Sequence, residues 1–256
     1  MTSRHHLPDL PRAAVSCKNC CLSELCVPTG LNAAELDQLS SIITRGPSLP
    51  RGKHLFHIGE PIHSLYAVRS GSVKVYVPTD PGEEQVLGFT LPGEFLGFDG
   101  IEAEHHTCAA VALETTSVCE LPYGRLEELC HAIPGIDSRI HKLIGREITV
   151  DHEMLILLGK KSAEERLATF LLSLSARFKR RGFSERDFNL SMSRHEIGNY
   201  LGLAVETVSR LFARFQDEKL VRVNRRYVQI LTMERLRELV GECPMDDSCP
   251  RLSEGL

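Results

Sequence analysis

The strongest structural signal in the chain is the stretch Ser193-Arg-His-Glu-Ile-Gly-Asn-Tyr-Leu-Gly-Leu-Ala-Val-Glu-Thr-Val-Ser-Arg-Leu-Phe-Ala-Arg-Phe215. Ser193 followed three residues later by Glu196 is a capping box, which predicts a helix that begins there and runs to about Leu201. Gly202 lies in the following turn, and a second helix is expected to begin near Val205. Its core face consists of residues at helical spacing: Val208, Leu211, Phe212 and Phe215. Two short helices joined by a glycine-bearing turn predict a helix-turn-helix, although any helical hairpin satisfies the same spacing.

The second helix of such a motif enters the major groove of DNA, which brings three of its side chains near the base edges. Arg210 can donate two hydrogen bonds to guanine, Glu206 can accept one from cytosine, and Ser209 can contact a base or a phosphate. After this helix, residues 220–223 and 227–231 predict a β-hairpin with a basic tip at residues 224–226. A wing of this kind favours DNA binding over an unrelated helical hairpin.

The distribution of charge separates this region from the rest of the chain. Between Lys160 and Glu238 there are 17 Lys and Arg against 10 Asp and Glu, although the formal net charge of the whole chain is −4. The remaining residues therefore hold 13 basic and 24 acidic side chains. A basic end joined to an acidic body suggests one part that meets a polyanion and one part that senses. The alternative is uneven surface charge without a partner.

The pattern changes to a period of two over residues 48–121, as in Ser64-Leu-Tyr-Ala-Val-Arg69 and Ser72-Val-Lys-Val-Tyr-Val77. Turns containing Gly or Pro interrupt these runs, for example Leu91-Pro-Gly-Glu94. Several short strands at this spacing predict an antiparallel barrel or sandwich. A small β-roll of this kind often encloses a ligand, and a plain packed core is equally compatible with the pattern.

A long helix is expected from Pro134 onward, with a heptad-like apolar pattern. Together with one acidic neighbour, these positions form the predicted dimer seam: Ile136, Ile140, Leu143, Val150, Asp151, Met154 and Leu157. Glu147 also falls on the seam, so the predicted coiled coil is of marginal stability. The alternative is a long helix that packs on its own core and has solvated edges.

Cysteines are concentrated in the segment Cys17-Lys-Asn-Cys20-Cys21-Leu-Ser-Glu-Leu-Cys26. Thiolates at this spacing suit zinc or an iron–sulfur cluster, and both need four ligands. The spacing leaves open whether Cys20 or Cys21 is a ligand, and which distant thiol completes the set. The candidates for the fourth ligand are Cys108, Cys119, Cys130, Cys243 and Cys249. Free structural thiols are the alternative.

The whole sequence has no run approaching the roughly 18 apolar residues that a membrane helix needs. Residues 1–16 contain no apolar stretch of the kind found in a secretory signal. We therefore expect a cytoplasmic protein without a membrane partner. Nine cysteines in that reducing compartment point to metal or redox chemistry rather than to disulfides.

From about Cys17 to Ile230 the chain resembles the fumarate-and-nitrate-reduction (FNR) regulators, the oxygen-sensing branch of the cyclic-AMP receptor protein superfamily. The resemblance rests on the C-x2-C-x5-C run of Cys17, Cys20 and Cys26 and on three longer strings: Glu114-Thr-Thr-Ser-Val-Cys119-Glu, Lys160-Lys-Ser-Ala-Glu-Glu-Arg166 and Ile197-Gly-Asn-Tyr-Leu-Gly-Leu-Ala-Val-Glu-Thr-Val-Ser-Arg210.

The resemblance implies an α+β fold with an N-terminal cyclic-nucleotide-binding-like β-roll, a long dimerisation helix and a C-terminal winged helix-turn-helix domain. The expected segments are a Cys-rich cluster-binding leader (1–30), the β-roll sensor domain (31–132), the dimerisation helix (133–159), the DNA-binding domain (160–240) and a tail (241–256).

The resemblance also implies a site and a mechanism. It assigns the fourth ligand to Cys119, leaves Cys21 and Cys108 as bystanders, and makes the bound group a 4Fe–4S cluster. Oxygen would convert the cluster, loosen the homodimer and release the DNA, which would control anaerobic gene expression by activation or repression. The base-reading residues match Glu206, Ser209 and Arg210, with a palindrome of TTGAT-type half-sites as the operator. Asp151 matches an acidic residue that repels its twin across the seam, and RNA polymerase is a further expected partner.

Three rival interpretations remain. A regulator of the same fold with zinc would be colourless and indifferent to oxygen. A cyclic-nucleotide-responsive regulator is disfavoured because residues 93–97 and 105–108, where such proteins carry an Arg for the phosphate, contain none. An iron–sulfur electron carrier or enzyme would have no reason to carry a winged helix-turn-helix, and the sequence has no nucleophile, base and oxyanion constellation. Cys243 and Cys249 lie outside the family pattern.

Overall fold

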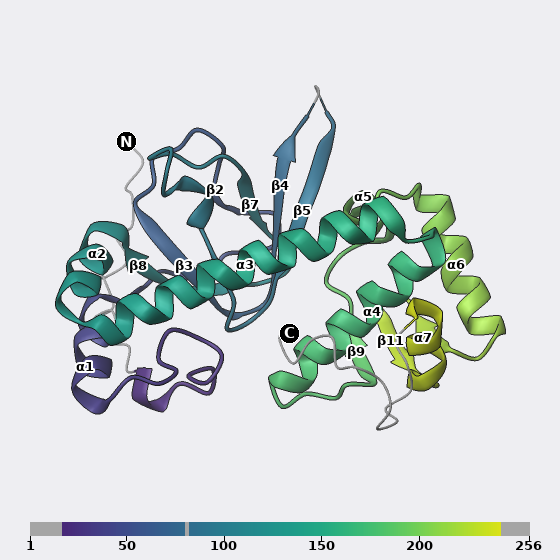
Figure 1. Cartoon of the computed structure of the whole chain (residues 1–256). Helices are drawn as coiled ribbons and strands as arrows, with labels where there is room; N and C mark the ends of the chain where they lie inside the picture. The colour runs from purple at the N-terminus through teal and green to yellow at the C-terminus, as the bar shows by residue number, and fades with distance from the viewer. Residues whose placement is uncertain (1–16, 80–81, 242–256) are drawn as a thin grey trace, which may run out of the picture. The chain divides into compact units, whose positions relative to one another are not determined.

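The computed structural model describes residues 17–79 and 82–241. The leader before Cys17 and the tail cysteines Cys243 and Cys249 lie outside the described residues. The chain divides into two compact units, which Figure 1 shows by element. The first contains Met1–Val73 and Thr90–Leu143, and the second contains Lys74–Phe89 and Ile144–Leu256.

The first unit is built on antiparallel strands, as the period of two predicts. One sheet has the strand order β1-β8-β3-β6, formed by β1 (Thr44–Arg45), β8 (Ser117–Pro122), β3 (Ser64–Ser70) and β6 (Phe95–Leu96). A second antiparallel pair joins β2 (His54–Phe56) to β7 (Ala109–Ala112). The helical elements of this unit are η1 (Cys17–Asn19), α1 (Ala33–Ile42), η2 (Phe98–Gly100) and α2 (Tyr123–Ala132).

The core of the first unit lies between the β1-β8-β3-β6 sheet and its helices. Leu65 on β3 and Leu121 on β8 are almost completely buried, as are Leu39 on α1 and Leu126 on α2. The alternation of buried and exposed side chains along a strand fixes which face meets this core. The opposite choice of face at Cys119 becomes important for the site.

The second unit consists of the hairpin strands β4 (Val73–Pro78) and β5 (Glu84–Thr90) and the elements after the long helix. These are α4 (Ala163–Arg180), β9 (Asp187–Asn189), α5 (Arg194–Leu201), α6 (Val205–Asp217), β10 (Val221–Asn224), β11 (Tyr227–Ile230) and α7 (Met233–Val240). β10, β11 and β9 form an antiparallel sheet in that order. The sequence predicts the β10–β11 wing, but it gives no signal for the short strand β9.

The helix-turn-helix is confirmed, and the reasons for its turn are local. Ser193 Oγ accepts from the Glu196 backbone N–H at 3.2 Å, and the Glu196 carboxylate accepts from the Ser193 N–H at 2.7 Å. Gly202 adopts φ +63°, a left-handed conformation that a glycine enters without strain. A Cβ on Gly198 would lie 2.6 Å from the Leu203 carbonyl oxygen. Both glycines therefore allow α5 and α6 to approach closely.

The long helix α3 extends from Pro134 to Lys160, and Pro134 occupies its first turn as expected. The predicted dimer seam needs correction. Four of its residues are buried within the chain itself: Ile136, Ile140, Leu143 and Leu157. Their heptad spacing serves the chain's own core, so they present no surface to a partner. Of the other three predicted seam residues, Val150 and Asp151 are exposed and Met154 is half-buried.

Within the described ranges, no helix is long and apolar enough to cross a membrane.

Candidate metal centre and DNA interface

The first site begins with the register of the β1-β8-β3-β6 sheet. Cys119 on β8 pairs with Arg45 on β1 and with Ala67 on β3, and Ala67 in turn pairs with Phe95 on β6. Directly paired residues of antiparallel strands point to the same face of a sheet. These four side chains therefore form one row, and all four line a single pocket.

Positions two residues away along a strand share this face as well. Ile43 and Leu121 lie two residues from Arg45 and Cys119, and both line the pocket. The wall on the sheet side is thus apolar except for Cys119 and the guanidinium of Arg45.

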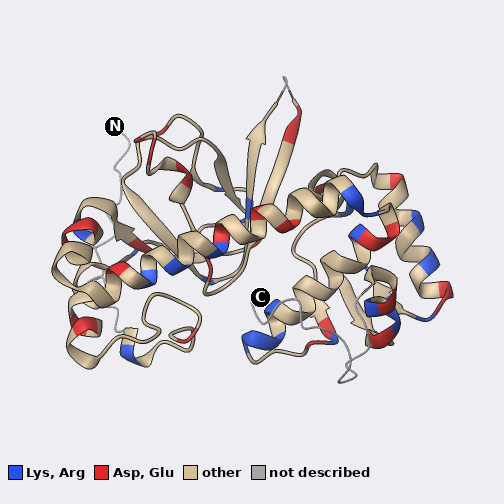
Figure 2. Ribbon diagram, in the orientation of Figure 1, with Lys and Arg blue, Asp and Glu red and all other residues tan. Residues whose placement is uncertain are grey.

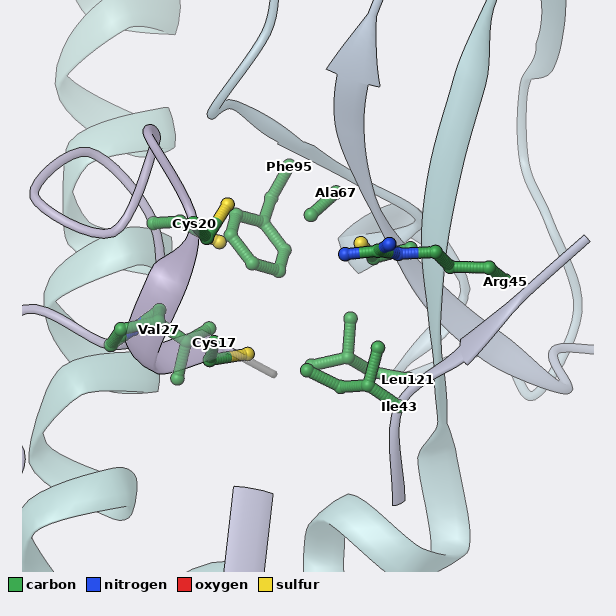
Figure 3. A pocket seen from close by; sticks show the side chains of 11 residues that line it. Cys17, Cys20, Val27, Ile43, Arg45, Ala67, Phe95 and Leu121 are labelled. Carbon is green, nitrogen blue, oxygen red and sulfur yellow. The ribbon is translucent and has the colours of Figure 1, made fainter. Parts of the chain in front are cut away.

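The leader supplies the opposite wall. Cys17, Cys20 and Cys26 line the same pocket as Cys119, together with Val27. In Figure 3 the Cys17 and Cys20 side chains point from the leader toward the side on which Arg45, Ile43 and Leu121 lie. Three thiols from one short segment thus meet a fourth that is about a hundred residues further along the chain, as the C-x2-C-x5-C run requires.

Hydrogen bonds hold the leader in this position. The Cys17 backbone N–H donates to Ser40 Oγ on α1 at 3.1 Å. The guanidinium of Arg139, on α3, donates to the Cys26 carbonyl oxygen at 3.1 and 3.3 Å, and to Thr29 Oγ1 at 3.3 Å. The cysteine segment is therefore tied directly to the first part of the long helix.

The remaining described cysteines lie elsewhere. Cys21, which the spacing could not separate from Cys20, is exposed and does not line the pocket. Cys108 is buried beside the Asp99 carboxylate, and burial raises its pKa. Cys130 lies on α2 and is also absent from the pocket wall. All seven described cysteines are free thiols.

Burial opposes ionisation of the pocket thiols when no cation is present. It raises the pKa of Cys26 to about 12 and raises the pKa values of Cys17 and Cys119. The thiols also raise one another's pKa values by charge repulsion. Arg45 acts in the opposite direction on Cys119, to which its side chain donates a hydrogen bond. Four thiolates here need a compensating cationic group.

The chemistry of this donor set can be tested against two kinds of metal group. Among the described residues, no three His, Cys, Asp or Glu side chains lie in a position to hold a single metal ion. A single zinc would draw its thiolate sulfurs to about 2.3 Å from one point. An iron–sulfur cluster instead separates the cysteine ligands, because each binds a different iron. Four thiols spread around an apolar pocket fit the larger group.

The second site is the outer face of α6. Glu206, Ser209 and Arg210 are all exposed on this helix, and Val208, Phe212 and Phe215 are buried on its other face. Leu211, predicted as a core residue, is half-buried. Arg210 contacts Thr207 Oγ1 at 3.3 Å, and Ser209 Oγ donates to the Val205 carbonyl oxygen at 2.8 Å. These weak local contacts leave both side chains able to turn toward a ligand.

The side chains around this face fix α6 in place. The Arg194 guanidinium lies 3.3 Å from the centre of the Phe212 ring, and burial lowers the pKa of Arg194 to about 10. Arg214 pairs with Glu218 at 2.7 Å and with Glu164 on α4 at 2.9 Å. Figure 2 shows basic side chains along α6 and at the end of α4.

The wing adds a second basic feature. Arg225, at the tip between β10 and β11, has φ +56° and an exposed side chain. Arg226 beside it donates to the Ser191 carbonyl oxygen at 3.0 Å. The tip can therefore offer Arg225 to a phosphate backbone while Arg226 anchors the wing.

Comparisons with known proteins agree with this arrangement. Residues 165–239 match the Crp-like helix-turn-helix domain, and residues 47–132 match the cyclic nucleotide-binding domain. A sensor-like β-roll joined to such a helix-turn-helix defines a DNA-binding transcription regulator rather than an enzyme.

The relatives narrow this class. The chain is 51% identical over 225 residues to the transcriptional activator protein Anr of Pseudomonas protegens, covering 88% of this chain and 92% of the relative. It is 49% identical over 228 residues to the fumarate and nitrate reduction regulatory protein of Vibrio cholerae, covering 89% and 91%. The solved structure of FixK2 from Bradyrhizobium japonicum matches with a TM-score of 0.71 at 30% identity, covering 77% of this chain and 97% of that one. The chain belongs to the fumarate and nitrate reduction regulators of the CRP/FNR superfamily.

Proposed function

We propose that this protein is an oxygen-responsive transcription regulator of the cytoplasm. It would carry an oxygen-labile 4Fe–4S cluster on Cys17, Cys20, Cys26 and Cys119, and the cluster-bound homodimer would bind a palindrome of TTGAT-type half-sites. RNA polymerase would be its partner at activated promoters of anaerobic genes. The observation that carries the proposal is the gathering of these four thiols on one pocket, apart from Cys21, Cys108 and Cys130.

When bound, the cluster would supply a group that oxygen can oxidise. The chain's own residues would do the rest. The four thiolates hold the leader against the sheet, and the apolar wall formed with Ile43, Leu121 and Phe95 limits access of water. Arg139 then connects this leader to α3 through the Cys26 carbonyl oxygen. Release of the leader would remove that restraint on the long helix.

The surface of α3 suggests a dimer face different from the seam predicted above. Ile148 and Leu155 are 50% and 70% exposed, which is unusual for large apolar side chains. Half-buried Ile144 and Leu158 and exposed Asp151 complete a pattern of alternating four- and three-residue steps, that of a coiled-coil seam. Asp151 would then lie inside the seam, where like charges from the two copies repel. The dimer would be marginally stable, so a small change at the leader could control it.

The β-roll is not proposed to bind a cyclic nucleotide. In the segment where a phosphate would need a cation, His106 is buried and stacks on Phe56 with ring centres 3.6 Å apart. Asp99 beside it accepts from the Thr107 N–H at 2.7 Å. A carboxylate at this position would repel a phosphate.

The test is purification without oxygen, followed by the visible spectrum and DNA binding before and after air is admitted. We expect a brown protein that bleaches and releases a TTGAT palindrome on the same timescale. A colourless protein that contains zinc and binds DNA regardless of air would leave a transcription regulator but overturn the proposed oxygen sensing.

A further inference from the structure

Arg45 is the one cationic side chain on the wall of the cysteine pocket. It is placed there by the strand register, because Arg45 pairs directly with Cys119 across β1 and β8. Figure 3 shows its side chain extending across the pocket toward the side of Phe95 and Cys20. Its position is therefore set by the same row of the sheet that presents the fourth thiol.

The guanidinium is only partly satisfied. It donates one hydrogen bond to the Cys119 thiol, yet its Nε is buried without a hydrogen-bond partner among the described residues. Buried donors are rarely left unpaired in folded proteins, since each loses its hydrogen bonds to water. An unpaired donor on the wall of a thiol-lined pocket points to an acceptor that belongs in that pocket.

A sulfur-rich anionic group would supply the acceptor. Four thiolates bring more negative charge than a 4Fe–4S core neutralises, and both the thiolate and the core sulfur atoms accept hydrogen bonds. A planar guanidinium offers several donors in a fixed fork together with a permanent positive charge. Hydrogen bonds to cluster sulfurs and nearby positive charge favour the more reduced state.

We propose that Arg45 is a positioning residue that donates to Cys119 and to the sulfur atoms of the group bound in the pocket, and so slows the loss of that group in oxygen. This inference rests on the proposed function, because it requires the cluster. It adds a regulatory role for a residue that is not itself a ligand. Removing the donor makes the cluster easier to oxidise and shifts its reduction potential to a more negative value.

The experiment compares the full-length wild type with Arg45→Gln and Arg45→Lys, all purified without oxygen. Iron and sulfide content, the visible spectrum and the reduction potential are measured first. The bleaching rate is then followed at a fixed oxygen concentration. We expect Arg45→Gln to bleach faster by on the order of tenfold, as is typical when an outer-shell partner of a metal ligand is lost. Arg45→Lys, which keeps the charge but not the fork, should lie between the two.

The matched control is Arg69→Gln. Arg69 also favours ionisation of Cys119 through its charge, but it is exposed and does not line the pocket. Its bleaching rate should stay close to that of wild type. If Arg45→Gln fails to take up the cluster while folded Arg45→Lys loads, the role of Arg45 toward the group also stands.

Two results would overturn the inference. One is an Arg45→Gln protein with wild-type cluster content, potential and bleaching rate. The other is an equal change in Arg69→Gln, which would reduce the effect to general charge. A wild-type protein without iron or sulfide would instead refute the proposed function itself, so the two failures are distinguishable.

Discussion

The two sites are built in opposite ways. The cysteine pocket is enclosed and mostly apolar, and its four thiols come from Cys17–Cys26 and from Cys119, which meet only after the sheet has formed. The face of α6 is exposed, and Glu206, Ser209 and Arg210 occupy a single short helix. A site assembled from distant segments can report whether those segments stay together. A site contained in one helix is always formed and needs only to be positioned.

The largest effect should come from removing the thiol that joins the two walls of the pocket. Cys119→Ala is expected to abolish retention of a complete cluster and oxygen-dependent DNA binding, because three ligands from the leader would no longer be linked to β8. Iron and sulfide content and the visible spectrum of the protein purified without oxygen measure this.

Cys108→Ala is the matched control, since Cys108 is also buried in the first unit but lies outside the pocket. It should retain the cluster. The comparison between the two sites would fail if Cys119→Ala kept a full cluster, because the pocket would then not depend on the distant strand.

A second prediction concerns α3, which continues from one unit into the other. Leu155→Glu should disrupt the proposed dimer face, since a symmetric dimer loses two buried leucines. At about 1.5–3 kcal/mol for each side chain, dimerisation should weaken by about 3–6 kcal/mol. Sedimentation equilibrium of the cluster-containing protein measures the dissociation constant.

Leu157→Ala separates this effect from loss of folding. Leu157 is 9% exposed and packs within its own chain, so the substitution should lower the free energy of unfolding by about 2–5 kcal/mol. Dimerisation of the folded protein should change little. A stronger dimer defect in Leu157→Ala than in Leu155→Glu would restore the seam that the sequence predicts.

The seam also shows where sequence analysis stops. Two apolar stripes overlap on α3, one containing Ile136, Ile140 and Leu143 and the other containing Ile148 and Leu155. Both have heptad spacing, and hydrophobicity alone does not distinguish burial in the chain's own core from burial against a partner. Exposure in the folded chain separates the two stripes.

Local signals were sufficient elsewhere. The capping box at Ser193 and the turn glycine Gly202 are properties of neighbouring residues, and they located α5 and α6 correctly. Arg45 gave no such signal, because its importance depends on pairing with a strand more than 70 residues later. The short elements β9, α2 and α7 were also missed, since each is held mainly by tertiary contacts.

The smallest predicted effect tests the self-contained site. Arg210→Ala should weaken binding to the specific palindrome by about 1–3 kcal/mol and relax preference at one half-site position, because a bidentate contact with guanine is lost. Arg225→Ala, at the wing tip, should weaken binding to specific and random DNA alike and reduce the salt dependence by about one phosphate contact. Fluorescence anisotropy with both DNAs over a range of salt concentrations measures these changes. Equal losses on specific and random DNA for Arg210→Ala would remove Arg210 from base recognition, and α6 would then position the protein on DNA without reading the sequence at that point.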